Sequence, residues 1–102
     1  MTRYARRVDK TQAEIVRALR AAGCSVASLH RVGGGVPDLL VGRAGVTYLL
    51  EAKRAAEPGH TVKNLHALTN ELQDEWAARW RGRPVDVVRT VDEALKAVGA
   101  TP

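Results

Sequence analysis

The fold is decided by residues 36–53, which read VPDLLVGRAGVTYLLEAK. Two short apolar runs, residues 39–42 and 46–50, flank Arg43-Ala44-Gly45, and this pattern predicts a β-hairpin whose turn depends on Gly45. Because both runs are almost continuously apolar, we expect each strand of the hairpin to be buried on both faces.

The hairpin register brings two acidic residues together. A two-residue turn pairs Arg43 with Val46, and the same register places Asp38 opposite Glu51. Facing residues of two strands have Cβ atoms about 4.5 to 5.5 Å apart, so two carboxylates there repel each other unless a cation lies between them. Oxygen ligands suit Mg²⁺ or Mn²⁺, and the open end of the hairpin therefore predicts a site for one of these ions.

Lys53 lies two residues beyond Glu51, so its side chain projects from the same face of the strand. An ammonium beside a metal-bound water can orient that water or offset charge on a phosphate, which indicates phosphodiester hydrolysis. A simpler interpretation also stands on these residues alone. Asp38 follows a proline and is then an ordinary turn residue, while Glu51 and Lys53 are a solvated strand end.

The remaining patterns predict three helices and two further strands around the hairpin. The helices are expected at 10–22, from 69 or 70 to 81, and at 91–98 with a Thr90 and Glu93 capping box; the strands are expected at 25–32 and 84–89. Glycines 33–35 are a break, and 54–68 is a long loop. This order, αβββαβα, predicts an α/β sandwich with a mixed central sheet. We expect one domain over 10–99, a basic flexible arm over 1–9 and a tail over 100–102.

The charge and composition of the chain indicate which kinds of partner it can bind. The net charge is +5, from 16 basic residues that are mostly arginine and 11 acidic residues, and such an excess attracts polyanions. No signal-peptide pattern or membrane-length apolar segment occurs, so we expect a cytoplasmic protein that does not bind membranes. The three histidines lack zinc-like spacing with Cys24, so no zinc site is expected.

The two acid-bearing stretches also resemble a known family. Gly35-Val36-Pro37-Asp38 and Leu49-Leu50-Glu51-Ala52-Lys53 look like the signature of the PD-(D/E)XK nuclease superfamily. More closely, the chain resembles standalone VRR-NUC-type domains, often found in phages, over residues 11–98. The resemblance implies a restriction-endonuclease-like sandwich fold. It also implies that the protein acts in the cytoplasm of a bacterial or phage-infected host cell.

The resemblance also implies roles for particular residues. Asp38 and Glu51 would bind the metal, the backbone carbonyl of Ala52 would add a ligand, and Lys53 would assist the attacking water. Glu14 on the first helix would be a further metal ligand, and Gln73 on the second helix would face the site. Local alternatives remain for the last two. Glu14 can pair on the helix surface with Lys10 or Arg17, and Gln73 can belong to a helix cap with Asn70.

The function expected from these features is a divalent-metal-dependent endonuclease that cuts structured or double-stranded DNA. The alternative is a non-catalytic DNA-binding module on the same fold, held to phosphates by arginines. A homodimer is expected as well, because one small domain presents one active site and cutting both strands requires two. The residues expected to contact nucleic acid are Arg6, Arg7, Arg31, Arg43, Arg54 and Lys63.

Overall fold

A computed structural model describes residues 3–53 and 71–100 of the chain, with side chains from residue 10 onward. Its helices are α1 (Arg3–Ala21), α2 (Glu71–Arg79) and α3 (Val91–Ala97), and its strands are β1 (Ser25–Ser28), β2 (Leu39–Arg43), β3 (Val46–Ala52) and β4 (Asp86–Val88). The predicted order αβββαβα is confirmed.

The four strands form one mixed sheet in the order β1-β2-β3-β4. β2 pairs antiparallel with β1 and β3, whereas β4 pairs parallel with β3. The predicted hairpin register is confirmed, with Arg43 opposite Val46 and Leu39 opposite Leu50. Both turn residues, Ala44 at φ 50° and Gly45 at φ 79°, are left-handed, as a type I′ turn requires, so the turn depends on both and not on Gly45 alone.

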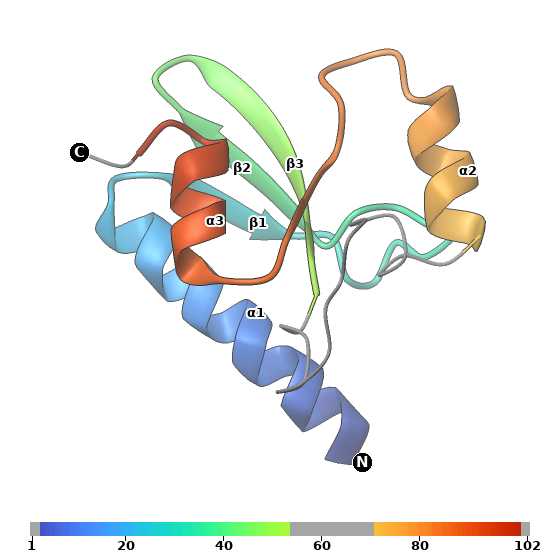
Figure 1. The fold of residues 1–102 in the computed structure, drawn as a ribbon, viewed down its shortest axis with the longest axis horizontal. Helices are drawn as coiled ribbons and strands as arrows, with labels where there is room; N and C mark the ends of the chain where they lie inside the picture. Colours follow the sequence, from blue (N-terminus) through green and yellow to red (C-terminus); the bar gives the residue numbers. More distant parts are fainter. Residues whose placement is uncertain (1–2, 54–70, 101–102) are drawn as a thin grey trace, which may run out of the picture.

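The hydrophobic core lies on one face of the sheet, under α1 and α3. Ile15 and Leu19 of α1 pack there with Leu39, Leu50 and other buried residues of the strands. Figure 1 shows α1 and α3 together against the sheet, while α2 stands apart from them near the other end of the strands. One face of the sheet is therefore covered by two helices, and α2 alone approaches the other.

That second face is only partly covered. Leu40 of β2 is 37% exposed, while β3 is buried from Leu49 to Ala52. The expectation that both hairpin strands are buried on both faces is therefore wrong for β2 and holds only for this second half of β3. The reason is that α2 has no buried residue, and an apolar cavity of about 360 Å³ remains between the sheet and Trp76 of α2 and Trp80, the residue after it.

The largest differences from the expected element boundaries are at the start of α1 and the end of β1; in addition, α2 ends at Arg79 and not at residue 81, and β4 spans Asp86–Val88 and not 84–89. α1 begins at Arg3 and not at Lys10, so residues 3–9 continue the helix where an arm was expected. No glycine or proline interrupts that segment, and the apolar periodicity marked only the part of the helix that packs on the core. β1 ends at Ser28 and not at residue 32, because the Val32 N–H donates to the Leu29 carbonyl and closes a turn.

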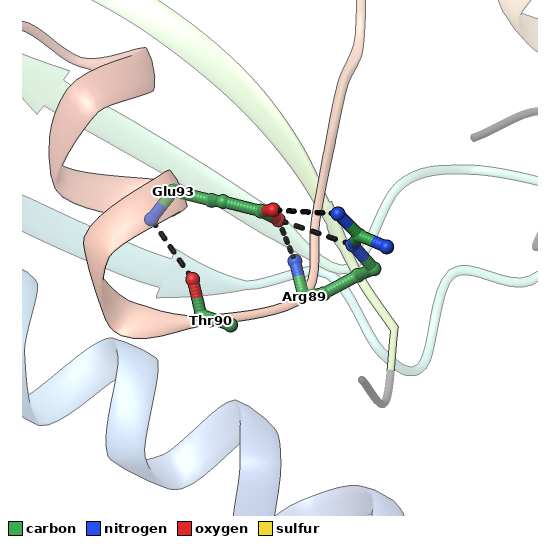
Figure 2. Close-up of polar contacts among 3 residues, drawn as sticks. All are labelled: Arg89, Thr90 and Glu93. Carbon is green, nitrogen blue, oxygen red and sulfur yellow. Dashed lines mark hydrogen bonds and ion pairs between the residues drawn. The ribbon is translucent and has the colours of Figure 1, made fainter. Parts of the chain in front are cut away.

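The predicted cap of α3 is present with one change of partner. The Thr90 hydroxyl accepts a hydrogen bond from the Glu93 N–H, at 3.1 Å. The Glu93 carboxylate in turn accepts from the backbone N–H of Arg89, one residue before the cap, and from its guanidinium (Figure 2). This closed set of bonds fixes the start of α3 directly after β4. None of the described helices has the length and apolarity needed to cross a membrane.

Candidate active site

The open end of the β2–β3 hairpin brings Asp38 beside the end of β3. Pro37 has no N–H, so the backbone ladder cannot continue past Asp38 in the usual way. Instead the Asp38 carboxylate takes over the pairing: its Oδ2 accepts a hydrogen bond of 2.9 Å from the Ala52 N–H. This bond holds the Asp38 side chain beside Ala52 at the end of β3, close to Glu51.

Glu51 is the one charged or polar side chain that is buried in the part of the chain that the structure describes, with 3% of its surface exposed. Two groups contact its Oε2 atom: the Lys53 ammonium at 3.4 Å and the Gln73 side-chain amide, which donates a hydrogen bond of 2.7 Å. The sequence placed Gln73 at the site only through resemblance, and the structure brings it into contact with Glu51. β3 thus supplies an acid and a lysine, and α2 supplies an amide.

The electrostatics of Glu51 are unfavourable for its charged form. The pKa of Glu51 is raised from 4.5 to about 7: burial contributes most of the rise, the neighbouring charge of Asp38 adds to it, and Lys53 offsets part of it. Near neutral pH this carboxyl therefore keeps a proton for about half of the time. A cation placed between Asp38 and Glu51 would reverse this balance, because it stabilises both carboxylates in their ionised form.

The glycine run before Asp38 lets the loop approach α2. Gly35 has a φ of +89°, and a Cβ at this position would collide with the backbone carbonyl of Leu72. No other residue type fits this contact without moving the first turn of α2, which carries Gln73. Gly35 therefore helps to set the distance between Gln73 and Glu51.

A small cavity of about 50 Å³ lies beside Glu51 and Gln73. Asp74 of α2 also lines this cavity, although sequence reasoning did not single it out. Its position directly after Gln73, in the first turn of an acidic helix, is the signal that was available. The cavity is large enough to hold a water molecule beside these polar groups.

Glu14 stays apart from this group. It is exposed on α1, and no three His, Cys, Asp or Glu side chains within 10–53 and 71–100 lie close enough to hold a metal ion. No ion pair joins it to Lys10 or Arg17 in the described residues either. The structure brings together two acids, Asp38 and Glu51. The role of Glu14 as a metal ligand stays a prediction.

The residues expected to contact nucleic acid are spread over the molecule. Arg43 sits at the turn end of the hairpin and donates a hydrogen bond of 3.4 Å to the Val98 carbonyl at the end of α3, which is a structural role. Arg31 is exposed in the turn that follows β1. Outside the described side chains lie Arg6, Arg7, Arg54 and Lys63, together with the predicted loop 54–68 and the expected cap at Asn70.

Comparison with solved structures identifies a shared fold. A structure described as "VRR_NUC domain" superposes with a TM-score of 0.59, is 24% identical, and the match covers 90% of this chain and 94% of that one. No family model matches the chain, and no curated protein matches it. The expected restriction-endonuclease-like sandwich is therefore confirmed, and the resemblance to VRR-NUC-type domains holds at the level of the fold.

Proposed function

We propose that this protein is a divalent-metal-dependent nuclease that hydrolyses DNA phosphodiesters, with structured or double-stranded DNA as its substrate. The observation that carries the proposal is the contact of Lys53 with a buried Glu51, at 3.4 Å, beside the carboxylate of Asp38. Burying an acid against a second acid costs free energy, and acids perturbed in this way cluster at functional sites. The nuclease name of the similar structure supports the same function.

The residues present fit Mg²⁺ or Mn²⁺. The Asp38 and Glu51 carboxylates supply oxygen ligands, and the pKa of Glu51 is raised by burial and by the charge of Asp38, both of which a cation between the acids would offset. The backbone carbonyl of Ala52 is a third ligand of the right chemistry. The N–H and C=O of a strand residue point toward the same neighbouring strand, and the Ala52 N–H points at Asp38. When bound, such an ion supplies an activated water and stabilises the leaving oxygen.

The side chains around the acids have separate roles in this proposal. The Lys53 ammonium lies next to Glu51, where it can hold the attacking water and offset negative charge on the phosphate. Gln73 holds the Glu51 carboxylate in one orientation, and the Ala52 N–H does the same for Asp38. Orientation matters because ligands that are fixed before the ion arrives bind it more tightly.

The test is cleavage of branched, duplex and single-stranded DNA by purified protein in Mg²⁺ or Mn²⁺. We expect cleavage that EDTA abolishes, and a loss of roughly 100-fold or more in Lys53→Ala and Glu51→Ala. Lys96→Ala and Glu75→Ala, two exposed positions on α3 and α2, serve as charge-matched controls that cut normally. Equal cleavage by wild type and Lys53→Ala would refute the assignment.

The rival function, a non-catalytic DNA-binding module, has one observation in its favour. Asp38 and Glu51 each have a protein partner, Ala52 and Lys53, so both acids have a structural role even without an ion. DNA binding that is independent of metal, with no cleavage of any of the three substrates, would establish that function.

We also propose that the protein is a homodimer. Two large apolar side chains are exposed in this region, Leu72 of α2 at 58% and Trp80 directly after α2 at 45%, and exposed apolar surface favours association between copies. Light scattering at working concentration should give twice the monomer mass, and Leu72→Glu should shift the mass toward the monomer. A monomer mass for the wild type would contradict the proposal.

A further inference from the structure

An open groove runs along the edge of the sheet where β1 lies. Its first part, about 560 Å³, lies between α1 and β1 and is lined by Gln12, Arg17, Arg20 and Ser28 among others. A second part, about 360 Å³, is lined by residues 28–32, and Ser28 belongs to both. Because the two hollows share Ser28, we treat them together and call them the β1-edge groove.

The charge of the β1-edge groove has one sign. Arg17 and Arg20 line its first part and Arg31 its second, and no Asp or Glu occurs among the described residues that line either part. All three arginines are exposed. Within the described part of the chain, none of the three forms an ion pair with a carboxylate. Their charge is therefore available to an anionic partner.

One of the arginines is held in place before any partner binds. The Arg20 guanidinium donates a hydrogen bond of 3.0 Å from Nη2 to the carbonyl of Val26 in β1. A guanidinium has five N–H donors, so this bond leaves others for a phosphate. An anchored arginine also loses less conformational entropy on binding than a free one.

One residue of the groove is hydrogen-bonded to a residue of the candidate active site. Leu29, which lines its second part, donates a backbone hydrogen bond of 2.7 Å to the carbonyl of Asp38. The second part of the groove therefore adjoins the residue that carries the first acid of the site. α1, β1 and the turn after it supply the groove, whereas β3 and α2 supply the other groups of the site.

We propose that the β1-edge groove binds the phosphate backbone of the nucleic-acid substrate and leads it to Asp38 and Glu51. This inference rests on the proposed function, because it names the surface that holds the substrate of that same site. Exposed arginine side chains in a lining without carboxylates suit the negative charge of a phosphodiester backbone. Such contacts position a strand without selecting its sequence, so the proposal implies binding with little sequence preference.

The experiment measures binding of labelled duplex and single-stranded DNA by fluorescence anisotropy in EDTA, over a range of salt concentrations. Replacing three phosphate contacts should lower the magnitude of the slope of log K against log salt by roughly 2 to 3. We therefore expect the variant Arg17→Gln/Arg20→Gln/Arg31→Gln to bind on the order of 100-fold more weakly near 0.1 M salt. Arg79→Gln/Arg81→Gln/Lys96→Gln is the control, since it removes the same charge from exposed positions outside the groove.

A second variant guards against a folding defect. Arg17→Gln/Arg31→Gln keeps the Arg20 bond to Val26, so β1 retains that support, and its slope should fall by roughly 2. If both groove variants bind like the control while the wild type cuts DNA in Mg²⁺, the groove assignment is wrong and the nuclease stands. If the wild type neither binds nor cuts DNA, both fail. Binding of the same variants to vesicles of anionic lipid is measured as well. If the groove variants bind these vesicles more weakly than the control does but bind DNA equally well, the groove assignment is also wrong.

Discussion

The Gln73 amide donates a hydrogen bond of 2.7 Å to the Glu51 carboxylate, and this bond ties α2 to the buried end of β3. α2 has no buried residue of its own, so few other contacts fix its position over the site. The bond therefore has two effects. It orients an acid of the site, and it holds the helix that closes the site on one side.

Replacing Gln73 should lower the affinity for the metal ion more than it lowers the stability of the fold. In Gln73→Ala, the Glu51 carboxylate loses its nearest donor, and we expect metal affinity to fall roughly 10- to 100-fold, as for other groups that orient a ligand. Calorimetric titration with Mn²⁺ measures this directly. Glu75→Ala, an exposed change on the same helix, is the control. Unchanged affinity in Gln73→Ala would show that the bond has no part in the site.

Gly35 should be more sensitive to substitution than its neighbour Gly34. Both have positive φ, so alanine costs about 1 kcal/mol of backbone strain at either position. Only at Gly35 does the added Cβ meet the backbone of α2, because Gly34 faces open space. We therefore expect Gly35→Ala to lose most of its cleavage activity while Gly34→Ala keeps it. Equal losses in the two variants would mean that the approach to α2 is unimportant.

The stability of the metal-free protein should fall as the pH rises. The pKa of Glu51 is about 7 in the folded protein and 4.5 when unperturbed, so between these values the folded state binds more protons than the unfolded state. Its stabilising contribution is present below pH 4.5 and is lost as the pH rises through 7, by about 3 kcal/mol in total. Urea unfolding in EDTA across this range, compared between wild type and Glu51→Gln, isolates the effect.

The comparison is decisive because other groups titrate in the same range. The Glu51→Gln variant should lack this decline and should exceed the wild type in stability at pH 8. Adding Mn²⁺ should restore stability to the wild type at that pH, by mass action on the folded state. If the two proteins show the same pH dependence, Glu51 is not perturbed by its surroundings.

Replacing Ala44 with glycine should stabilise the folded protein. Ala44 has a φ of 50° in the hairpin turn, a conformation that costs a non-glycine residue roughly 1 kcal/mol. Ala44→Gly is expected to raise the free energy of unfolding by about 0.5 to 1 kcal/mol, after the added chain entropy of the unfolded state is counted. Gly45→Ala should lower it. Chemical denaturation measures both, and destabilisation by Ala44→Gly would contradict the type I′ turn.

The hairpin and its register were predictable because the determinants are local. A turn at Ala44 and Gly45 sets every pair along β2 and β3, and so places Asp38 beside Glu51 before any tertiary contact is known. Lys53 follows from strand alternation. Gln73 was reached only by resemblance, since its contact with Glu51 joins residues 22 apart and depends on how α2 packs.

The errors have a common physical origin. Hydrophobic runs indicate that a segment is apolar, and they do not say what covers it. β2 therefore looked buried on both faces, although α2 leaves Leu40 partly exposed. In the same way, apolar periodicity marked the part of α1 that packs on the core and missed residues 3–9, which continue the helix.

The most direct test of the central claim is a crystal structure of the protein soaked in Mn²⁺, with anomalous scattering used to locate the ion. We expect anomalous density between the Asp38 and Glu51 carboxylates, within about 2.0 to 2.3 Å of an oxygen from each, and none in Asp38→Asn/Glu51→Gln. Mn²⁺ bound elsewhere, with the two carboxylates holding no ion, would contradict the account.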